Sequence, residues 1–190
     1  MVTFNAENII GDYSCPGPAK RVVIVDDHPL IRTGLQRIID RSDSFVVCGE
    51  AGTAADGLKV ISKQKPEIAI VDVSLPGGDG IGLTERLTKK FRRLVILVLS
   101  MHDEPEYALR AIDAGAMGYM VKNEAAEKIE MALRQVLTGR PYLSPSVAGE
   151  LAFDVILRRQ QKRPALKPPS RQRKSTGAHH KSAKQKSVGS

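Results

Sequence analysis

The sequence contains no tryptophan, few other aromatic residues, only two cysteines and no long apolar run. Aromatic residues make up 4% of the chain, which argues against a binding surface dominated by aromatic stacking. Cys15 and Cys48 show neither metal-binding nor redox spacing, a usage that suits a reducing cytoplasm better than a disulfide scaffold. No apolar segment approaches the ~20 residues that cross a membrane, and the N-terminus lacks the features of a signal peptide. We therefore expect a soluble, cytoplasmic protein without membrane contact.

Acidic residues are absent from the last part of the chain. All 21 Asp and Glu lie within residues 1–157 together with 18 Lys and Arg, so this part carries a net charge of −3. Residues 158–190 hold 11 basic residues and no acid, a net charge of +11. The overall charge of +8 thus combines a mildly acidic body with a strongly basic tail, and each must be judged by itself.

Between residues 20 and 139 the sequence alternates between two patterns. Short runs rich in β-branched residues end near a Gly, an acid or a hydroxyl, and three of them are apolar almost throughout, as in strands buried on both faces of a parallel sheet. Stretches with helical periodicity separate these runs. Five repeats of strand then helix predict a doubly wound α/β sandwich with a five-stranded parallel sheet and right-handed crossovers. The predicted strands are "RVVIV" (21–25), "FVVCGEA" (45–51), "EIAIV" (67–71), "LVILVLS" (94–100) and "MGYMV" (117–121).

The two ends of the chain differ from this alternating region. The segment "RPYLSPS", from Arg140, begins as a turn, and the spacing of Val147, Leu151 and Val155 predicts one further amphipathic helix. Beyond Gln160 large apolar residues are almost absent, so the segment cannot bury enough surface to offset its chain entropy. In order, we expect a disordered leader (1–19), a folded domain (20–140), a linker helix (141–160) and a disordered basic tail (161–190).

Polar side chains stand at the carboxyl ends of four of the five predicted strands. In an open parallel sheet, ligands bind beyond these ends, where the strand order reverses. The first strand ends in Asp26 and Asp27, the third in Asp72 and the fourth in Ser100, and Lys122 follows the fifth. One rim of the sheet therefore receives three carboxylates, a hydroxyl and an ammonium group.

This combination favours phosphoryl transfer assisted by Mg²⁺. Three clustered carboxylates would raise each other's pKa unless a cation lay among them, and Mg²⁺ prefers oxygen ligands from one or two carboxylates, water and phosphate. Asp72 could then act as a nucleophile that forms an acyl phosphate. Lys122 would stabilise the transferred charge, and Ser100 could donate a hydrogen bond to a phosphate oxygen.

Each of these residues taken singly also has a simpler explanation. An Asp at the end of a strand is often a turn residue or a helix cap, and Asp26 and Asp27 could cap the helix that begins near Pro29. Ser100 and Lys122 alone would be ordinary surface residues. The joint pattern at four strand ends favours a functional site. His28 and His102 lie on the same rim, but we do not assign them as ligands, because oxygen ligands already account for a hard metal ion.

The sequence resembles a known family in several separated segments. The segments "VVIVDDHPLIRTGLQRII", "EIAIVDVSLPGGDGIGL", "VILVLSMHDEPEYALRAIDAGAMGYMVKNEA" and "GRPYLSPSVAGEL" are similar to the receiver domain of bacterial two-component response regulators, in the NarL/FixJ branch. The resemblance covers about residues 21–148 and agrees in order and spacing. It implies a flavodoxin-like fold with strand order 2-1-3-4-5 and transfer of a phosphoryl group from a phosphohistidine of a sensor histidine kinase to Asp72.

The resemblance also implies a role for each site residue. Asp26, Asp27, Asp72 and the backbone carbonyl of Ser74 would hold Mg²⁺, and Lys122 would pair with the phosphate. Ser100 would be the switch hydroxyl, and Tyr119 the aromatic residue whose rotamer follows it, although from the residues alone Tyr119 is simply part of a strand. Phosphorylation would add about −1.5 to −2 charges at this rim. We expect the segment 101–121 to respond as a dimerisation or partner surface.

The chain departs from the family pattern after the receiver domain. Members of this branch usually carry a LuxR-type helix-turn-helix domain of four helices, and residues 149–190 are too few and lack the apolar periodicity for it. The 158–190 tail has three open interpretations: a functionally neutral extension, a phosphate-binding segment for nucleic acid, or a contact for an acidic protein surface. The nucleic-acid interpretation requires an affinity that falls steeply as salt rises. Gly78 is a smaller departure, where a larger apolar residue is more common.

Three functions remain open from the sequence. The first is a phospho-accepting switch, in a family that mostly regulates transcription, or a stand-alone receiver that acts through protein contacts without binding DNA itself. The second is a phosphatase that forms an aspartyl phosphate, but such enzymes use Asp-x-Asp after the first strand, whereas Val73 and Ser74 follow the nucleophile candidate here. The third is an interaction module that no longer transfers phosphate, which the complete set of site residues disfavours.

Overall fold

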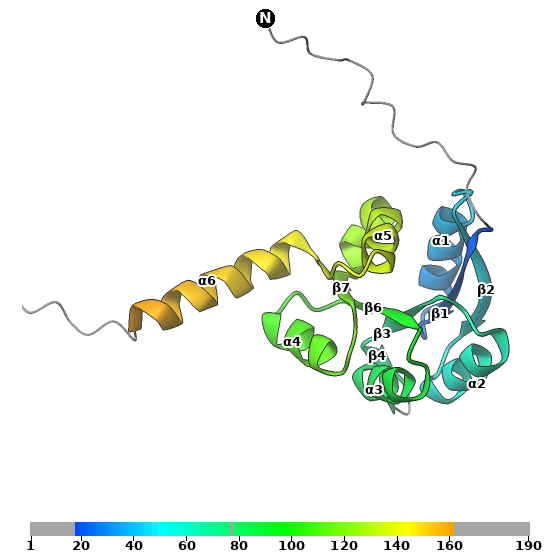
Figure 1. The fold of residues 1–190 in the computed structure, drawn as a ribbon, viewed down its shortest axis with the longest axis horizontal. Coiled ribbons are helices and arrows are strands. Elements are labelled where there is room, and N and C mark those ends of the chain that lie inside the picture. The colour runs from blue at the N-terminus through cyan, green and yellow to red at the C-terminus, as the bar shows by residue number, and fades with distance from the viewer. Residues whose placement is uncertain (1–17, 77, 162–190) are drawn as a thin grey trace, which may run out of the picture.

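The computed structural model describes residues 18–76 and 78–161, which form an α/β sandwich (Figure 1). The main strands are β1 (Lys20–Val25), β2 (Phe45–Ala51), β3 (Ile68–Asp72), β6 (Val95–Ser100), β7 (Gly118–Val121) and β8 (Tyr142–Leu143). The helices are α1 (Pro29–Ile39), α2 (Ala54–Gln64), α3 (Gly80–Lys90), α4 (Pro105–Asp113), α5 (Lys122–Leu137) and α6 (Pro145–Gln161). Prolines begin α1 and α4, where a first helical turn tolerates a residue without an N–H group.

The main sheet has the strand order β2-β1-β3-β6-β7-β8. Every pair of neighbouring strands in it is parallel, and β3 pairs with β1 on one side and β6 on the other. The first five strands of this order correspond to the predicted order 2-1-3-4-5. Strand β3 is buried over its whole length, which explains why its sequence is apolar up to Asp72.

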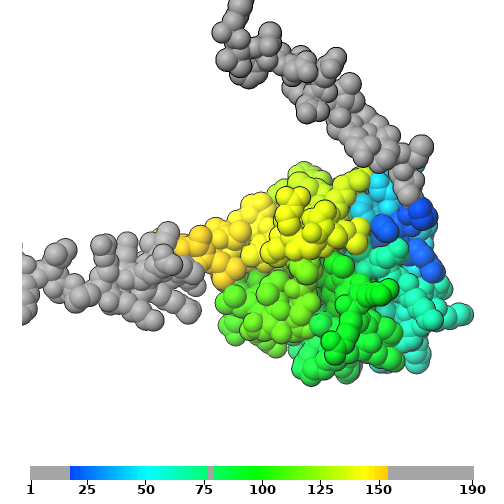
Figure 2. All heavy atoms as spheres, in the orientation of Figure 1, coloured from blue at the N-terminus to red at the C-terminus, as the bar shows by residue number. Residues whose placement is uncertain are grey.

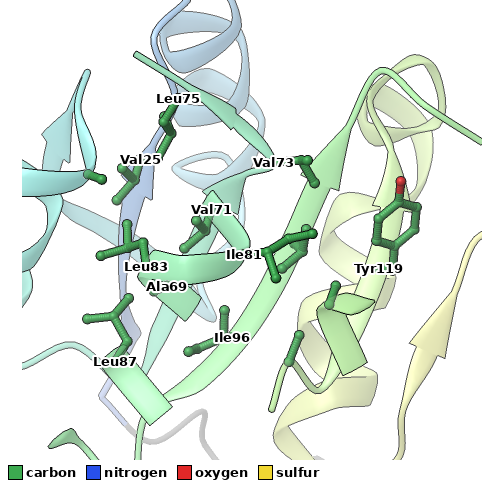
Figure 3. Packing of buried hydrophobic residues seen from close by; sticks show 14 of the residues in the cluster. Val25, Ala69, Val71, Val73, Leu75, Ile81, Leu83, Leu87, Ile96 and Tyr119 are labelled. Carbon is green, nitrogen blue, oxygen red and sulfur yellow. The ribbon is translucent and has the colours of Figure 1, made fainter. Parts of the chain in front are cut away.

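Helices cover both faces of the sheet and divide the core into two clusters (Figure 1). On one face, α1 and α5 pack on side chains such as Ile24, Ile70 and Leu99. On the other face, α2, α3 and α4 pack on alternate residues of the same strands, among them Val25 and Val71 (Figure 3). This alternation follows from the period of two along a strand, which sends neighbouring side chains to opposite faces.

The prediction of five strands was wrong by one strand and one hairpin. Strand β8 adds a sixth parallel strand beside β7, pairing Gly118 with Tyr142 and Tyr119 with Leu143. Two residues are too few to show a periodicity, so the sequence of "RPYLSPS" predicts only a turn. The loop after Asp72 also forms a small antiparallel hairpin of β4 (Ser74–Leu75) and β5 (Gly78–Asp79).

The predicted C-terminal helix is present as α6. Its first turns lie against the body, since Val147 is fully buried and Leu151 packs on the core. The described part of α6 then extends from the body beside α4 (Figures 1 and 2). The predicted disorder of the leader and of the basic tail concerns residues that, apart from 18, 19 and 161, lie outside the described part of the chain. Among the described helices, none is long and apolar enough to cross a membrane.

Gly80 permits a close approach between α3 and the end of β3. A Cβ atom added to Gly80 would lie 1.7 Å from the backbone oxygen of Asp72, and the Gly80 N–H group donates to the oxygen of Val73 at 2.9 Å. Asp79 caps the same helix by accepting a hydrogen bond from the Ile81 N–H group at 2.9 Å. Backbone packing therefore requires glycine at the first residue of α3, where the helix begins against the backbone of Asp72.

We expect Gly80→Ala to destabilise the fold by about 1–3 kcal/mol or more, because backbone atoms must move to admit the methyl group. Gly82→Ala is the matched control in the same helix, where the added Cβ would meet only Asp79 Cβ at 3.9 Å. That control should stabilise the protein by up to about 1 kcal/mol through helix propensity. Urea unfolding followed by circular dichroism measures both, and a Gly80→Ala variant as stable as Gly82→Ala would contradict the assignment.

Candidate functional site

Adjacent strands bring the predicted rim residues to one edge of the sheet. Asp26 and Asp27 follow β1, and Asp72 is the last residue of the neighbouring β3. Ser100 ends β6, the next strand, and Lys122 follows β7 as the first residue of α5. The chain reverses its strand order between β1 and β3, the position at which ligands bind in open α/β sheets.

A buried lysine joins two of the carboxylates. Lys122 Nζ lies 2.7 Å from Asp26 Oδ2 and 2.8 Å from Asp72 Oδ2, and the side chains of both acids are only 1% exposed. The side chain of Lys122 is 3% exposed. One ammonium group therefore balances part of the charge of two buried acids, and removing it would leave carboxylates that water cannot solvate.

Burial and charge act in opposite directions on this ion pair. Burial raises the pKa of the Asp72 carboxyl, and the hydrogen bond and positive charge of Lys122 oppose that rise without cancelling it. Burial lowers the pKa of the Lys122 amine, but its close contacts with the carboxylates of Asp26 and Asp72 outweigh burial, so the pKa of Lys122 is raised. The lysine therefore stays charged at neutral pH.

The acids form a cluster whose oxygens could hold a divalent cation. One ligand atom from each of Asp26, Asp27, His28 and Asp72 lies within 4.8 Å of all the others. Asp27 Oδ1 is buried and accepts no hydrogen bond, although His28 Nδ1 lies 2.7 Å from it. Asp26 Oδ2 meets Lys122 as an ion pair but likewise accepts no well-aligned hydrogen bond. Carboxylate oxygens without hydrogen-bond donors suit a hard cation such as Mg²⁺.

Two residues outside the predicted set support the first acid. The His28 N–H group donates to Asp26 Oδ1 at 2.8 Å, which makes His28 part of the cluster even though its side chain is 58% exposed. Arg32 donates to the backbone oxygen of Asp26 at 2.6 Å and pairs with Glu50 at 3.1 Å. Nothing in the sequence marks Arg32, because its contact depends on α1 lying beside the end of β1.

Ser74 lies in the hairpin that follows the central acid. Its N–H group donates to Asp72 Oδ1 at 3.2 Å, so the two oxygens of Asp72 have different partners, Ser74 and Lys122. This hydrogen bond helps to orient the Asp72 carboxylate. The role of the Ser74 carbonyl as a metal ligand stays a prediction.

The predicted switch residues meet at the backbone of His102. Ser100 Oγ accepts a hydrogen bond from the His102 N–H group at 2.9 Å, and the Tyr119 hydroxyl donates to the His102 carbonyl at 2.7 Å. Ser100 and Tyr119 are fully buried, and burial raises the pKa of Tyr119. The sequence predicts only that His102 lies on this rim and is not a metal ligand. The His102 backbone links Ser100 and Tyr119 through hydrogen bonds that no sequence pattern predicts.

The His102 ring continues this connection onto α4. It stacks on Tyr107 with the ring centroids 4.6 Å apart and the planes at 15°. The Arg110 guanidinium lies over the Tyr107 ring, 5.9 Å from its centroid. Arg110 also lies 3.5 Å from Asp79 Oδ2. The loop after β6 is thereby tied to α4 as well as to Ser100 and Tyr119.

Comparison with known proteins identifies this arrangement. The family model for the response regulator receiver domain matches residues 22–134. The chain belongs to this family. Response regulator GacA from Pseudomonas aeruginosa is 35% identical over 133 residues, which cover 70% of this chain and 62% of that protein. A probable transcriptional regulatory protein NarL from Mycobacterium tuberculosis is 34% identical over 160 residues, covering 84% of this chain and 74% of the relative.

Solved structures show the same fold. A LuxR-family two-component response regulator from an Aurantimonas species superposes with a TM-score of 0.70 and 33% identity, covering 73% of this chain and 99% of the other. The receiver domain of NarL from Mycobacterium tuberculosis gives a TM-score of 0.62 and 34% identity, with 65% and 100% covered. The predicted family and flavodoxin-like receiver fold are therefore confirmed.

The comparisons also limit what can be transferred from the relatives. The chain spans 62% of the length of the GacA proteins that it matches. Receiver domains of this family belong to two-component response regulators, most of them transcription regulators, and act as signalling switches that bind Mg²⁺ at an acidic pocket. Response regulators of this type partner with sensor histidine kinases and often dimerise.

We expect Lys122→Met to lower the free energy of unfolding by about 3–5 kcal/mol at neutral pH, because Asp26 and Asp72 lose their buried counter-ion. Added Mg²⁺ should raise the melting temperature of this variant more than that of the unsubstituted protein, since the cation then meets an uncompensated acidic cluster. Lys128→Met is the matched control in the same helix. It removes a partly exposed i,i+4 pair with Glu124 and should change the stability far less than Lys122→Met. Thermal unfolding with EDTA and with Mg²⁺ measures these effects, and equal losses in both variants would refute the role of Lys122.

Proposed function

We propose that this chain is a phosphorylation-driven switch in which Asp72 accepts a phosphoryl group from a phosphohistidine of a sensor histidine kinase. The observation that supports this most directly is the placement of a buried carboxylate and a buried lysine 2.8 Å apart beside two further acids. A carboxylate placed for structural reasons alone would not need a lysine and two more acids around it at a strand end.

The reaction is a displacement at phosphorus. A carboxylate oxygen of Asp72 forms the new O–P bond as the N–P bond of phosphohistidine breaks, and the departing imidazole nitrogen recovers a proton. Lys122 would leave its ion pair with the Asp72 oxygen to stabilise the negative charge of the phosphoryl oxygens. Ser100 would donate a hydrogen bond from its hydroxyl group to one of them. The step changes Asp72 itself and turns over no external substrate, so the protein acts as a switch rather than as a conventional enzyme.

Asp26, Asp27, Asp72 and the backbone carbonyl of Ser74 would hold the Mg²⁺ ion. The buried Asp27 Oδ1, which accepts no hydrogen bond, supports this set. When bound, the ion supplies positive charge that neutralises phosphoryl oxygens during transfer. This chain's own contribution is to hold the Asp72 carboxylate in place through the Ser74 N–H group and Lys122.

The switch would run from Ser100 to the segment 101–121. Rotation of Ser100 toward a phosphoryl group on Asp72 takes its oxygen away from the His102 N–H group. The Tyr119 hydroxyl shares the same loop through the His102 carbonyl, so the buried ring and the loop would change together. Met101 is 71% exposed and Leu109 is 49% exposed on this segment, which supports its use as a dimerisation or partner surface.

The output of the switch would be control of transcription or of a protein partner. GacA and NarL carry the names of regulators, and one relative of known structure, RcsB, is described as dimers bound to two DNAs. We place the receiver domain at 20–140 and a linker helix at 141–160, and we propose a cytoplasmic location, in keeping with the free thiol of Cys48. A nucleic-acid or acidic partner for the 158–190 tail stays a prediction, because nearly all of that segment lies outside the described residues.

We expect the protein to be phosphorylated by acetyl phosphate in the presence of Mg²⁺ but not with EDTA. Asp72→Asn should abolish the label, because the amide is not a nucleophile toward phosphorus. Asp113→Asn removes a carboxylate from the exposed end of α4 and is the matched control that should keep the label. Intact-protein mass spectrometry and stability of the phosphate to acid but not to base provide the measurement. Equal labelling of the Asp72→Asn variant would overturn the assignment.

We also expect a beryllofluoride adduct to change amide hydrogen exchange within residues 101–121, because the adduct occupies the position of a phosphoryl group on Asp72. Exchange in β2 and α2, at the opposite edge of the sheet, should stay the same and serves as the internal control. Hydrogen–deuterium exchange with mass spectrometry compares the protein with and without the adduct. An unchanged 101–121 segment would exclude this switching surface.

A further inference from the structure

The junction between β8 and α6 reaches the residue that precedes Lys122. Ser144 is fully buried and lies between the last residue of β8 and Pro145, the first residue of α6. Its hydroxyl oxygen accepts a hydrogen bond from the Val121 N–H group at 2.9 Å, and its own N–H group donates to the Tyr119 carbonyl at 3.0 Å. One serine therefore binds the backbone of β7 at Tyr119 and at Val121, directly before α5 begins at Lys122.

The pairing pattern explains why a hydroxyl is needed there. The carbonyls of Met117 and Tyr119 accept from the N–H groups of Tyr142 and Ser144, so alternate residues of β7 face the sixth strand. By the same alternation the Val121 N–H group faces β8, but β8 ends at Leu143 and the chain turns into α6 at Pro145. The Ser144 side chain supplies the acceptor that the ended strand no longer provides.

The side chain of Val121 cannot accept hydrogen bonds from the unpaired backbone N–H groups at the start of α5. It is the N-cap residue of α5, and its side chain makes no capping hydrogen bond. Valine carries no polar side-chain atom, so the buried Val121 N–H group depends on Ser144. The next residue is Lys122, whose ammonium group must lie within 3 Å of both Asp26 and Asp72.

The start of α6 is also attached to the first turn of α5 and to the core around Tyr119. Ser146 Oγ donates to Glu124 Oε1 at 3.2 Å, and the fully buried Val147 belongs to the same core cluster as Tyr119 and Val121. The described start of α6 thus contacts the elements that carry Lys122 and Tyr119 at several points.

We propose that Ser144 is a positioning residue for phosphoryl transfer, which acts by fixing the Val121 backbone and thereby the reach of Lys122 toward Asp72. It also makes the β8–α6 junction a physical link between the phosphorylation site and the helix that follows the receiver fold. The proposal rests on the function proposed above, but its structural part concerns Val121 and Lys122 and can be measured without phosphorylation.

The test compares Ser144→Ala with Ser146→Ala in the full chain. Both variants delete one hydroxyl from the same junction, but only the first removes the partner of the Val121 N–H group, while the second removes the more exposed bond to Glu124. We expect Ser144→Ala to lower the maximal rate of labelling by acetyl phosphate by about fivefold to tenfold, the scale expected for leaving one buried donor unpaired. The Mg²⁺ concentration at half-maximal rate should stay the same, because Lys122 and Ser144 are not expected ligands.

A second readout separates positioning from a general loss of structure. Partial unfolding would reduce the fraction of protein that is labelled and leave the rate of the folded fraction unchanged, whereas misplacement of Lys122 lowers the rate itself. In the absence of phosphate donor, Ser144→Ala should speed amide exchange at Val121 and shift the side-chain ammonium resonance of Lys122 in NMR spectra, and Ser146→Ala should do neither.

The outcomes distinguish this inference from the function on which it rests. If the unsubstituted protein takes no label on Asp72, the proposed function fails, while the Val121 exchange and the Lys122 resonance still decide whether Ser144 positions the lysine. If the unsubstituted protein is labelled and Ser144→Ala matches Ser146→Ala in rate, in Val121 exchange and in the Lys122 resonance, the positioning role of Ser144 is refuted and the proposed function stands.

Discussion

The ion pair between Lys122 and the carboxylates of Asp26 and Asp72 is the interaction on which the remaining arrangement depends. All three groups are nearly inaccessible to water, so the two buried carboxylates depend on the Lys122 ammonium group, which lies within about 3 Å of each of them. The three residues come from the ends of β1 and β3 and from the start of α5. A shift of any of these elements would leave a buried charge unpaired and destabilise the fold. The site therefore constrains the fold as much as the fold builds the site.

Several backbone contacts hold these charged side chains in position. Gly80 lets α3 begin against the carbonyl of Asp72, where any side chain would collide with the backbone. The Ser74 N–H group orients one oxygen of the same acid, and Ser144 holds the residue before Lys122. These contacts differ in strength, but they have a common result, because each fixes the backbone directly next to a charged side chain.

The connection from the site to the surface is made of hydrogen bonds rather than of packing alone. Ser100 accepts a hydrogen bond from the His102 N–H group, Tyr119 donates one to the His102 carbonyl, and the His102 ring stacks on Tyr107 of α4. These contacts connect Ser100 to α4 through the loop that follows β6. On the other side of β7, the start of α6 contacts the same strand through Ser144. Strand β7 lies between these two routes, which makes it the element where a signal from Asp72 could reach both.

The sequence by itself determined the alternation of strands and helices, the order of the first five strands through family resemblance, and the identity of the charged residues at the strand ends. These features are local: a buried strand shows itself as an apolar run, and its end is marked by the first polar residue, as at Asp72 and Ser100. Only the tertiary structure decided which atoms pair. Two-residue strands such as β8 carry no periodicity, and the roles of Arg32, His102 and Ser144 arise from hydrogen bonds with backbone groups. Such contacts depend on how the elements pack against one another, and the sequence pattern does not show which atoms that packing brings within hydrogen-bond distance.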